Sequence, residues 1–343
     1  MKAVYVEDAY KITVKDVAVP NLRKNDVLIE VKMAGICGSD IHTYKGLHPF
    51  RKPPVIIGHE ISGVVKEIGS DVEGVKVGDK VTVEPQIGCG TCEYCRSGNV
   101  NLCEDRTAPG LNGWYGTMAE YFVAPERTVF KLPDNMDFKI GALVEPLAVG
   151  VHAVRKGSIS IGSKVAILGA GPIGLLAMAA ARVAGATVTY ITDVLDYALD
   201  AAKRMGATHA KNIEGKMDWH QTALEEIGGK FDVVLIAAGI PGIIDDGLKL
   251  LKKGGRIVTI AMFQDTQTFD IHNLQNQEKE IVGCMTYNSP DTQTAIELLA
   301  NNKIITEPLV SHYLELEKVD YGFRIVNKKE DQSLKVLISF EKS

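Results

Sequence analysis

Features that would assign this chain to a nucleic-acid-binding or membrane class are missing from its sequence. No block of five like charges occurs, and a formal charge of −5 with a pI near 5.9 gives no electrostatic footprint for nucleic acid or an anionic membrane. The N-terminal residues contain no apolar signal-peptide core. We therefore expect a cytoplasmic protein whose partners are a small molecule or further copies of the same chain.

Long apolar runs are also scarce. The longest uncharged run, Val165 to Ala181, has 17 residues, which is barely enough to cross a bilayer, and it contains three glycines and one proline. A buried strand, a turn and a helix fit this composition better. The sequence shows no internal repeat and no low-complexity segment, and 343 residues are enough for about two domains with separate cores.

Short strand-like segments punctuated by glycine and proline fill residues 1 to about 150, as in "DVLIEVKMAG" and "DKVTVEP". They predict a mainly antiparallel, partly barrel-like β domain. From 151 to 289, apolar strands alternate with helices, as in "KVAILGAG" followed by "PIGLLAMAAARVAG". This alternation predicts an α/β domain with a parallel sheet covered on both faces. The tail, 290–343, is expected to return to the first domain.

The hexamer "GAGPIG" places Gly169, Gly171 and Gly174 in G-x-G-x-x-G spacing between a strand and a helix. Glycines at these positions allow a tight turn, close approach of a pyrophosphate and close packing of helix on strand. Asp193 ends the next strand, where a carboxylate accepts hydrogen bonds from ribose hydroxyls and repels a 2′-phosphate. The pattern predicts a dinucleotide site that prefers NAD. A purely structural glycine turn and a helix-capping aspartate are the alternatives.

Only six cysteines occur, and four of them stand within fifteen residues: Cys89, Cys92, Cys95 and Cys103. A disulfide framework does not suit a large cytosolic chain, and a redox motif needs only one pair of cysteines. An iron–sulfur motif usually places its fourth cysteine at a different distance. Four thiolates in one short loop favour tetrahedral zinc with every position filled. Such a site is structural, so the chemistry must lie elsewhere.

Two further stretches, "AGICGSDIHTY" and "IIGHEISGVV", carry candidate ligands for a second, open metal site. The candidates are Cys37, His59 and Glu60, with Glu145 of "LVEPLAV" as a further carboxylate. An open zinc site needs three protein ligands and one position for substrate. Spacing alone leaves other readings open, namely a buried cysteine, a surface turn at His59 and Glu60, and a satisfied carboxylate at Glu145.

The whole chain resembles the zinc-dependent medium-chain dehydrogenase/reductase family, and most of all its sorbitol, threonine and 2,3-butanediol dehydrogenase branch. The resemblance rests on motifs in the same order along the chain: "GICGSDIH", "GHEISGVV", "VGDKV", the four-cysteine loop, "GTMAEYFVAPE", "LVEPLAV" and "GAGPIGLLA". It implies a GroES-like catalytic domain over 1–150 and 290–343, with a structural zinc lobe at 85–105. It also implies a Rossmann NAD-binding domain over 151–289.

By this resemblance, a catalytic zinc ion is held by Cys37, His59 and, directly or through a water molecule, Glu60. Glu145 lies in or just outside the coordination shell. The four-cysteine loop holds a second, structural zinc ion. The implied activity is oxidation of a secondary alcohol, a polyol or vicinal diol, to a ketone by hydride transfer to NAD. Family members are usually homodimers or homotetramers.

The resemblance also assigns a proton relay and coenzyme contacts. Ser39 takes the substrate proton and His42 delivers it to solvent, because the pKa of histidine lies close to the working pH. Asp40 is expected to orient a neighbouring group. The residues matched to coenzyme binding are Gly169, Gly171, Pro172, Ile173, Gly174 and Asp193.

Some positions depart from the related sequences. Thr286 stands where the polyol branch carries an arginine beside a tyrosine, and Ala198 replaces an arginine common in the threonine branch. Sorbitol-, threonine- and butanediol-type substrates therefore all stay open, as does a non-catalytic NAD-binding sensor. A zinc-free reductase of the same superfamily would lack the ligand set present here. Cys284 is expected to pack within its apolar strand. Surface or capping positions are expected for the remaining histidines, His48, His209, His220, His272 and His312.

Overall fold

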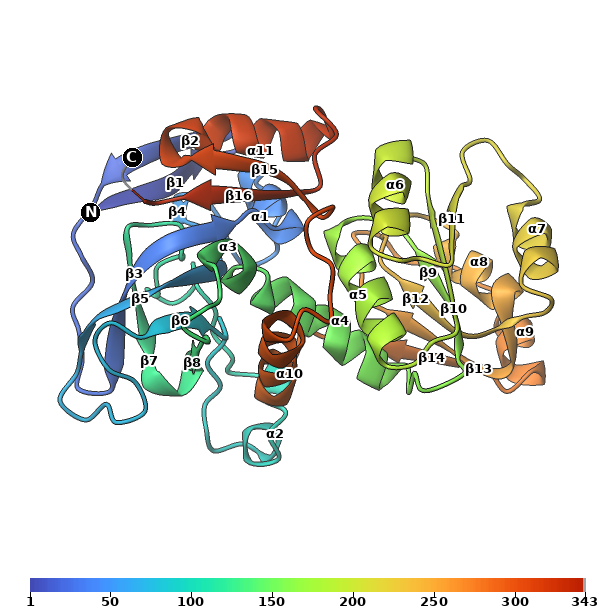
Figure 1. Cartoon of the computed structure of the whole chain (residues 1–343), viewed down its shortest axis with the longest axis horizontal. Coiled ribbons are helices and arrows are strands. Elements are labelled where there is room, and N and C mark those ends of the chain that lie inside the picture. The colour runs from blue at the N-terminus through green and yellow to red at the C-terminus, as the bar shows by residue number, and fades with distance from the viewer. Residues whose placement is uncertain (342–343) are drawn as a thin grey trace. The chain divides into compact units, whose positions relative to one another are not determined.

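Apolar side chains that run along short strands build the first of two structural units. The computed structural model describes residues 1–341 (Figure 1). The first unit contains Met1–Glu145, Asn288–Asn301 and the chain from Val310 onward, and the second contains Pro146–Tyr287 and Asn302–Leu309. The first unit is therefore assembled from segments on both sides of the second in the sequence.

The strand at the centre of the first unit is β3 (Asp26–Gly35), which is buried along almost its whole length. Its sheet has the strand order β15-β16-β3-β5-β6-β8, and β7 also pairs with β3. All pairs are antiparallel except β15 with β16, which run parallel. The other strands of this sheet are β5 (Glu60–Ile68), β6 (Lys80–Val83), β7 (Tyr121–Pro125), β8 (Val129–Lys131), β15 (Val310–Glu315) and β16 (Lys335–Ser339).

The described part of the first unit also contains a smaller sheet and five α-helices. The smaller sheet has the order β2-β1-β4, with β1 (Lys2–Asp8), β2 (Lys11–Asp16) and β4 (Val55–Ile56). The helices are α1 (Gly38–Tyr44), α2 (Glu93–Arg96), α3 (Phe138–Gly141), α10 (Ser289–Ala300) and α11 (Val319–Lys328). The fully buried ring of Phe323 on α11 lies 5.6 Å from the ring of Tyr44 on α1. This contact joins α1 to the C-terminal part of the chain.

The second unit is a six-stranded parallel sheet in the order β11-β10-β9-β12-β13-β14. Its strands are β9 (Lys164–Leu168), β10 (Val188–Asp193), β11 (His209–Asn212), β12 (Phe231–Ile236), β13 (Leu251–Thr259) and β14 (Glu280–Gly283). Its helices are α5 (Pro172–Val183), α6 (Asp196–Arg204), α7 (Trp219–Glu226), α8 (Ile243–Leu250) and α9 (Ile271–Asn276), while α4 (Val144–Lys156) leads into it from the first unit. The strand order reverses between β9 and β12, and open α/β sheets bind ligands at such a point. This is the predicted doubly wound Rossmann sheet.

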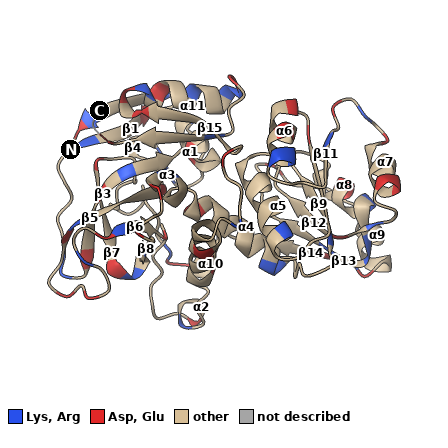
Figure 2. Ribbon diagram, viewed as in Figure 1, with Lys and Arg blue, Asp and Glu red and all other residues tan. Residues whose placement is uncertain are grey.

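Basic and acidic residues are interspersed along the ribbon of both units (Figure 2). None of the helices in the described part of the chain combines the length and the hydropathy that a membrane crossing requires.

Candidate functional site

The pairing of β3 with two other strands brings together parts of the chain that are far apart in sequence. Gly35, at the end of β3, lies opposite Glu60 on β5 and opposite Leu337 on β16. Cys37 follows β3 by two residues, and His59 directly precedes β5. As a result, the ligand atoms of Cys37, His59 and Glu60 lie within 4.8 Å of one another. The structure gathers these three predicted residues into one cluster.

The cluster is buried. His59 is 8% exposed and Glu60 0%, so the alternative of a surface turn at these residues is wrong. A thiolate, an imidazole and a carboxylate form a donor set that zinc binds, and three protein ligands leave a fourth position for substrate. The chemistry of the donors therefore fits a catalytic metal ion.

Asp40 lies beside His59 and beside the backbone of Cys37. Its Oδ1 lies 3.4 Å from His59 Nδ1, and its Oδ2 accepts a hydrogen bond of 3.1 Å from the backbone N–H of Cys37. Burial alone would raise the pKa of Asp40, but the charges of His59 and Arg51 bring it below its ordinary value. Burial likewise opposes charge on His59, yet Asp40 and Cys37 raise the pKa of His59 well above its usual range. The surroundings of His59 thus favour a positive charge at the cluster, as a metal cation would supply.

Lys335 holds the Glu60 carboxylate. The Lys335 Nζ donates to both Glu60 oxygens, at 2.7 and 2.8 Å, and to the carbonyl of Ile36 at 3.2 Å. The Glu60 carboxylate also needs the space beside Gly35, because a Cβ on Gly35 would lie 1.9 Å from Glu60 Oε2. Lys335 thus holds the Glu60 carboxylate by hydrogen bonds, and the absence of a side chain at Gly35 leaves room for it.

Glu145 lies near the cluster but stands apart from its ligand atoms. It is buried in the first turn of α4. Burial would lower the pKa of Lys335, but the charges of Glu60, Cys37 and Glu145 raise it above its ordinary value. Among the described residues, the group of mutually close ligand atoms contains Glu60 and does not contain Glu145. The charge of Glu145 is thus felt at Lys335, the partner of Glu60.

The helix α1 carries the two residues predicted to move a proton. Ser39 and His42 are three residues apart, so they share one side of the helix, and both are half-buried. Burial lowers the pKa of His42 below its ordinary value, and the positive charge of Lys45 adds to this effect. His42 is consequently neutral near pH 7 and can accept a proton.

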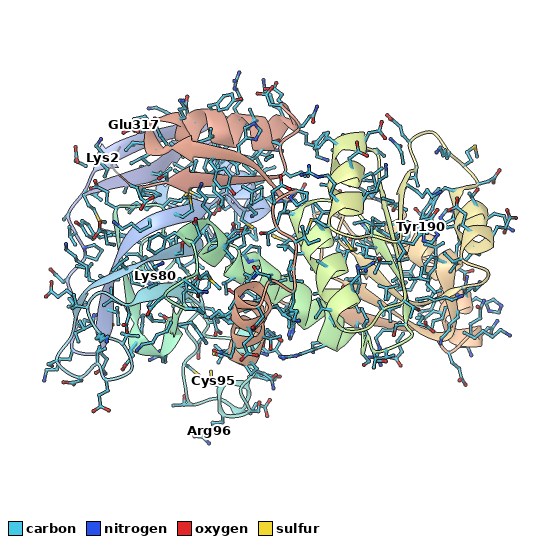
Figure 3. All side chains as sticks on the ribbon, viewed as in Figure 1. Lys2, Lys80, Cys95, Arg96, Tyr190 and Glu317 are labelled. Carbon is cyan, nitrogen blue, oxygen red and sulfur yellow. The ribbon has the colours of Figure 1, made fainter. Side chains whose placement is uncertain are left out.

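The four cysteines of the loop around α2 form a second cluster, of which Figure 3 labels Cys95. Their sulfur atoms lie within 4.8 Å of one another, and all four are free thiols. Backbone N–H groups point at three of the sulfurs, at 3.4 Å each, which favours thiolates. A Cβ on Gly88 would lie 2.5 Å from Cys95 Sγ, so this glycine leaves room for the cluster. Four convergent sulfurs fit a closed zinc site.

The glycine-rich turn joins β9 to α5 with the geometry that the sequence predicts. Gly169 has φ of +108°, and a Cβ on Gly174 would lie 1.9 Å from the carbonyl oxygen of Gly169. Gly171 is the N-cap of α5 and has open space around it. Asp193 Oδ2 accepts a hydrogen bond of 2.7 Å from the backbone N–H of Ala170, which fixes this carboxylate beside the turn. A helix N-terminus with open space before it suits a pyrophosphate.

His48 occupies a capping position, one of the two kinds expected for the histidines: it is buried, and its Nδ1 accepts hydrogen bonds from the backbone N–H groups of Phe50 and Arg51. Three residues near the cluster were not expected from the sequence. Gly35, Arg51 and Lys335 belong to the cluster or its immediate surroundings but were not singled out from sequence. Of these three, only Lys335 could have been found from the sequence. It stands inside the apolar run "LKVLISF", and a charged residue in a buried strand needs a partner of opposite charge.

Two family models match the chain. The alcohol dehydrogenase GroES-like domain matches residues 23–134, and the zinc-binding dehydrogenase matches residues 172–301. The chain is 36% identical over 342 residues to a protein of Aspergillus clavatus named "Probable D-xylulose reductase A", covering 97% of this chain and 95% of that protein. It is 34% identical over 348 residues to sorbitol dehydrogenase of Bacillus subtilis, covering 98% and 97%.

Solved structures are also similar over almost their whole length. The 2R,3R-butanediol dehydrogenase from Bacillus subtilis has a TM-score of 0.91 and 30% identity over 99% of both chains. A short chain alcohol dehydrogenase from Escherichia coli, complexed with NADH, has a TM-score of 0.92 and 28% identity over 99% of both chains. A Sinorhizobium meliloti protein described as a zinc-binding dehydrogenase, bound to NADP, has a TM-score of 0.91 and 31% identity over 98% of both chains.

The fold and these matches define the class as the zinc-dependent alcohol dehydrogenases. The chain belongs to the medium-chain dehydrogenase/reductase family within that class, as the sequence predicted. The predicted fold, a GroES-like domain with a Rossmann domain, is confirmed. The protein is an alcohol or polyol dehydrogenase that works with zinc and a nicotinamide coenzyme.

A substitution at Gly35 tests whether the Glu60 carboxylate needs the space that the missing side chain of Gly35 leaves. Gly35→Ala is expected to displace the Glu60 carboxylate, to lower zinc affinity by about 10- to 100-fold and to slow alcohol oxidation. The measurement is zinc content after dialysis against a weak chelator, together with turnover. Gly38→Ala is the matched control, because a Cβ on Gly38 meets nothing within 4 Å. Equal zinc content and turnover in the two variants would contradict this role of Gly35.

Proposed function

We propose that this protein oxidises a secondary hydroxyl of a polyol or vicinal diol to a ketone, with NAD as the hydride acceptor. The observation that carries the proposal is the buried cluster of Cys37, His59 and Glu60 next to the start of α1. The names of relatives support the substrate class, since sorbitol is a polyol and 2,3-butanediol is a vicinal diol.

The proposed cofactors are two zinc ions per chain and NAD. Cys37, His59 and Glu60 would hold the catalytic ion, and the four cysteines would hold the structural one. When bound, the catalytic ion supplies Lewis acidity toward the substrate hydroxyl, and the nicotinamide ring accepts the hydride. The contacts of Lys335 and Gly35 with Glu60 support Glu60 as the third protein ligand, with Glu145 behind it.

The chain itself supplies the proton path. In the proposed mechanism Ser39 accepts the proton that the substrate hydroxyl loses, and His42 carries it to solvent. The shared side of α1 supports this pairing, and the lowered pKa of His42 keeps that imidazole neutral and ready to accept. Asp40 meanwhile holds His59 in one orientation.

The proposed preference for NAD rests on Asp193. Its carboxylate is held at the end of β10 by the backbone N–H groups of Ala170, Val194 and Leu195. A fixed negative charge beside the ribose position accepts hydrogen bonds from a 2′-hydroxyl and repels a 2′-phosphate. We further propose a cytoplasmic homodimer or homotetramer. Four free thiols in one loop suit a reducing compartment.

The substrate class is tested by following NADH absorbance with purified, zinc-loaded protein. The panel contains sorbitol, xylitol, galactitol, a hexitol phosphate, both 2,3-butanediol enantiomers, threonine and simple secondary alcohols, each with NAD and with NADP. Turnover of a polyol or diol, faster with NAD and abolished by a chelator, is expected. Absence of turnover with every alcohol from protein with two bound zinc ions would overturn the proposal and favour a non-catalytic role.

Cysteine substitutions separate the two proposed zinc ions. Cys37→Ala is expected to retain one zinc ion per chain, to lose turnover and to keep most of its thermal stability. Cys103→Ser is expected to lose the other ion and to unfold at a lower temperature, because a closed zinc site contributes directly to folding. Cys284→Ser is the control and should keep both ions. Zinc analysis and thermal unfolding check these outcomes; a wild-type chain with one zinc ion would contradict the assignment.

The pH dependence tests His42. Because burial and Lys45 lower its pKa, the neutral, proton-accepting form should persist to a pH below the ordinary value of 6.5. The kcat for alcohol oxidation should therefore fall only on the acid side of 6.5. His42→Gln should reduce kcat by about 100-fold and remove this inflection. His272→Gln, an exposed histidine on α9, is the control. An unchanged inflection in His42→Gln would exclude His42 from the relay.

A further inference from the structure

Arg51 is a buried arginine in the segment between α1 and β4. The residue is 8% exposed, and its guanidinium lies against the fully buried Asp40, with 3.4 Å between Arg51 Nη1 and Asp40 Oδ1. The same carboxylate oxygen lies 3.4 Å from His59 Nδ1. One oxygen of Asp40 is therefore placed between an arginine and a proposed metal ligand.

The backbone and the aliphatic stem of Arg51 are both held in place. Its backbone N–H donates to His48 Nδ1 at 2.9 Å. Burial and the charge of Arg51 lower the pKa of His48 to about 4, so at neutral pH His48 is an acceptor for this hydrogen bond. The stem passes beneath Gly110, where a Cβ would lie 2.9 Å from Arg51 Cδ and 3.4 Å from Val55. The stem is thus packed on one side, and the guanidinium at its end lies against Asp40.

The pairing costs more than a surface ion pair would. Asp40 and Arg51 are both charged and buried, and Arg51 Nε has no hydrogen-bond partner within the part of the chain that the structure describes. A buried donor without a partner destabilises the folded state, because it loses its hydrogen bonds to water and gains none in return. An apolar residue would fill the same space without that cost. The arrangement is therefore explained better by a requirement at Asp40 than by the stability of the segment.

We infer that Arg51 is a positioning residue for the metal site: it fixes the Asp40 carboxylate, which in turn fixes the imidazole of His59. The inference rests on the proposed zinc ligands. A carboxylate behind a histidine ligand sets the orientation and basicity of the ring, and its loss commonly weakens metal binding by about 10- to 100-fold. Arg51 in turn supports the Asp40 carboxylate. Through its own backbone hydrogen bond to His48, Arg51 also connects Asp40 to the segment between α1 and β4.

The experiment measures metal binding and not turnover. Arg51→Met keeps most of the stem and removes the charge, Arg51→Lys keeps the charge, and Lys52→Met is the control, an exposed neighbour with the same change of charge. The affinity for zinc is measured by competition with a chromophoric chelator. The ion bound at the Cys37 site is recognised as the one that is absent from Cys37→Ala. Cobalt replaces zinc for visible absorption spectra, which report ligand geometry.

Arg51→Met is expected to bind this ion about 10-fold more weakly and to change the cobalt spectrum, with Arg51→Lys between it and wild type. Lys52→Met should match wild type. Wild-type affinity and spectrum in Arg51→Met would overturn the inference, even if the melting temperature fell. Failure of the proposed function is distinguishable, because the wild-type chain would then bind no ion that depends on Cys37.

A double variant guards against a folding defect in Arg51→Met. Asp40→Asn with Arg51→Met removes both buried charges, so neither is left without its partner. If Arg51 acts through Asp40, the double variant should bind the ion no more weakly than Asp40→Asn alone. Additive losses of affinity in the double variant would show that Arg51 acts by another route and would overturn the inference.

Discussion

Buried charge at the end of β3 is the constraint on which the cluster of Cys37, His59 and Glu60 depends. Lys335 and Glu60 have side chains that are 2% and 0% exposed, so the loss of hydration must be offset by their two hydrogen bonds and by the carbonyl of Ile36. The pair spans 275 residues of sequence. It forms only when β16 lies in register beside β3, so the proposed metal site needs β16 as well as its own ligands.

Asp40 links three features that would otherwise be independent. Its carboxylate caps the start of α1 through the N–H of Cys37, faces the ring of His59 and receives the guanidinium of Arg51. Asp40 therefore couples the start of α1 to the orientation of the His59 ring and to the course of the segment that contains Arg51. Two of the proposed ligands, His59 and Glu60, are neighbours in sequence, yet each is held by a different buried partner. A metal ion placed there would meet ligands with little freedom to reorganise.

Long, strongly patterned elements could be predicted from the sequence, and short ones could not. The alternation of "KVAILGAG", "PIGLLAMAAARVAG" and "TVTYITD" predicted β9, α5 and β10, because apolar strands and an alanine-rich helix have distinct patterns. Shorter elements such as β4, β11 and α9 went unpredicted. Their few residues carry too little pattern, and neighbouring elements decide their conformation.

The sequence by itself determined the features whose residues are close together along the chain. The four-cysteine loop and the glycine-rich turn are such features, because spacing fixes which atoms can meet within a short loop. Tertiary structure alone decided what surrounds Glu60 and His59. Gly35, Arg51 and Lys335 reach the cluster through strand register and through the fold of the segment after α1. Because buried charges must be paired, Lys335 lies against Glu60 and Arg51 against Asp40. No local sequence pattern encodes these pairings.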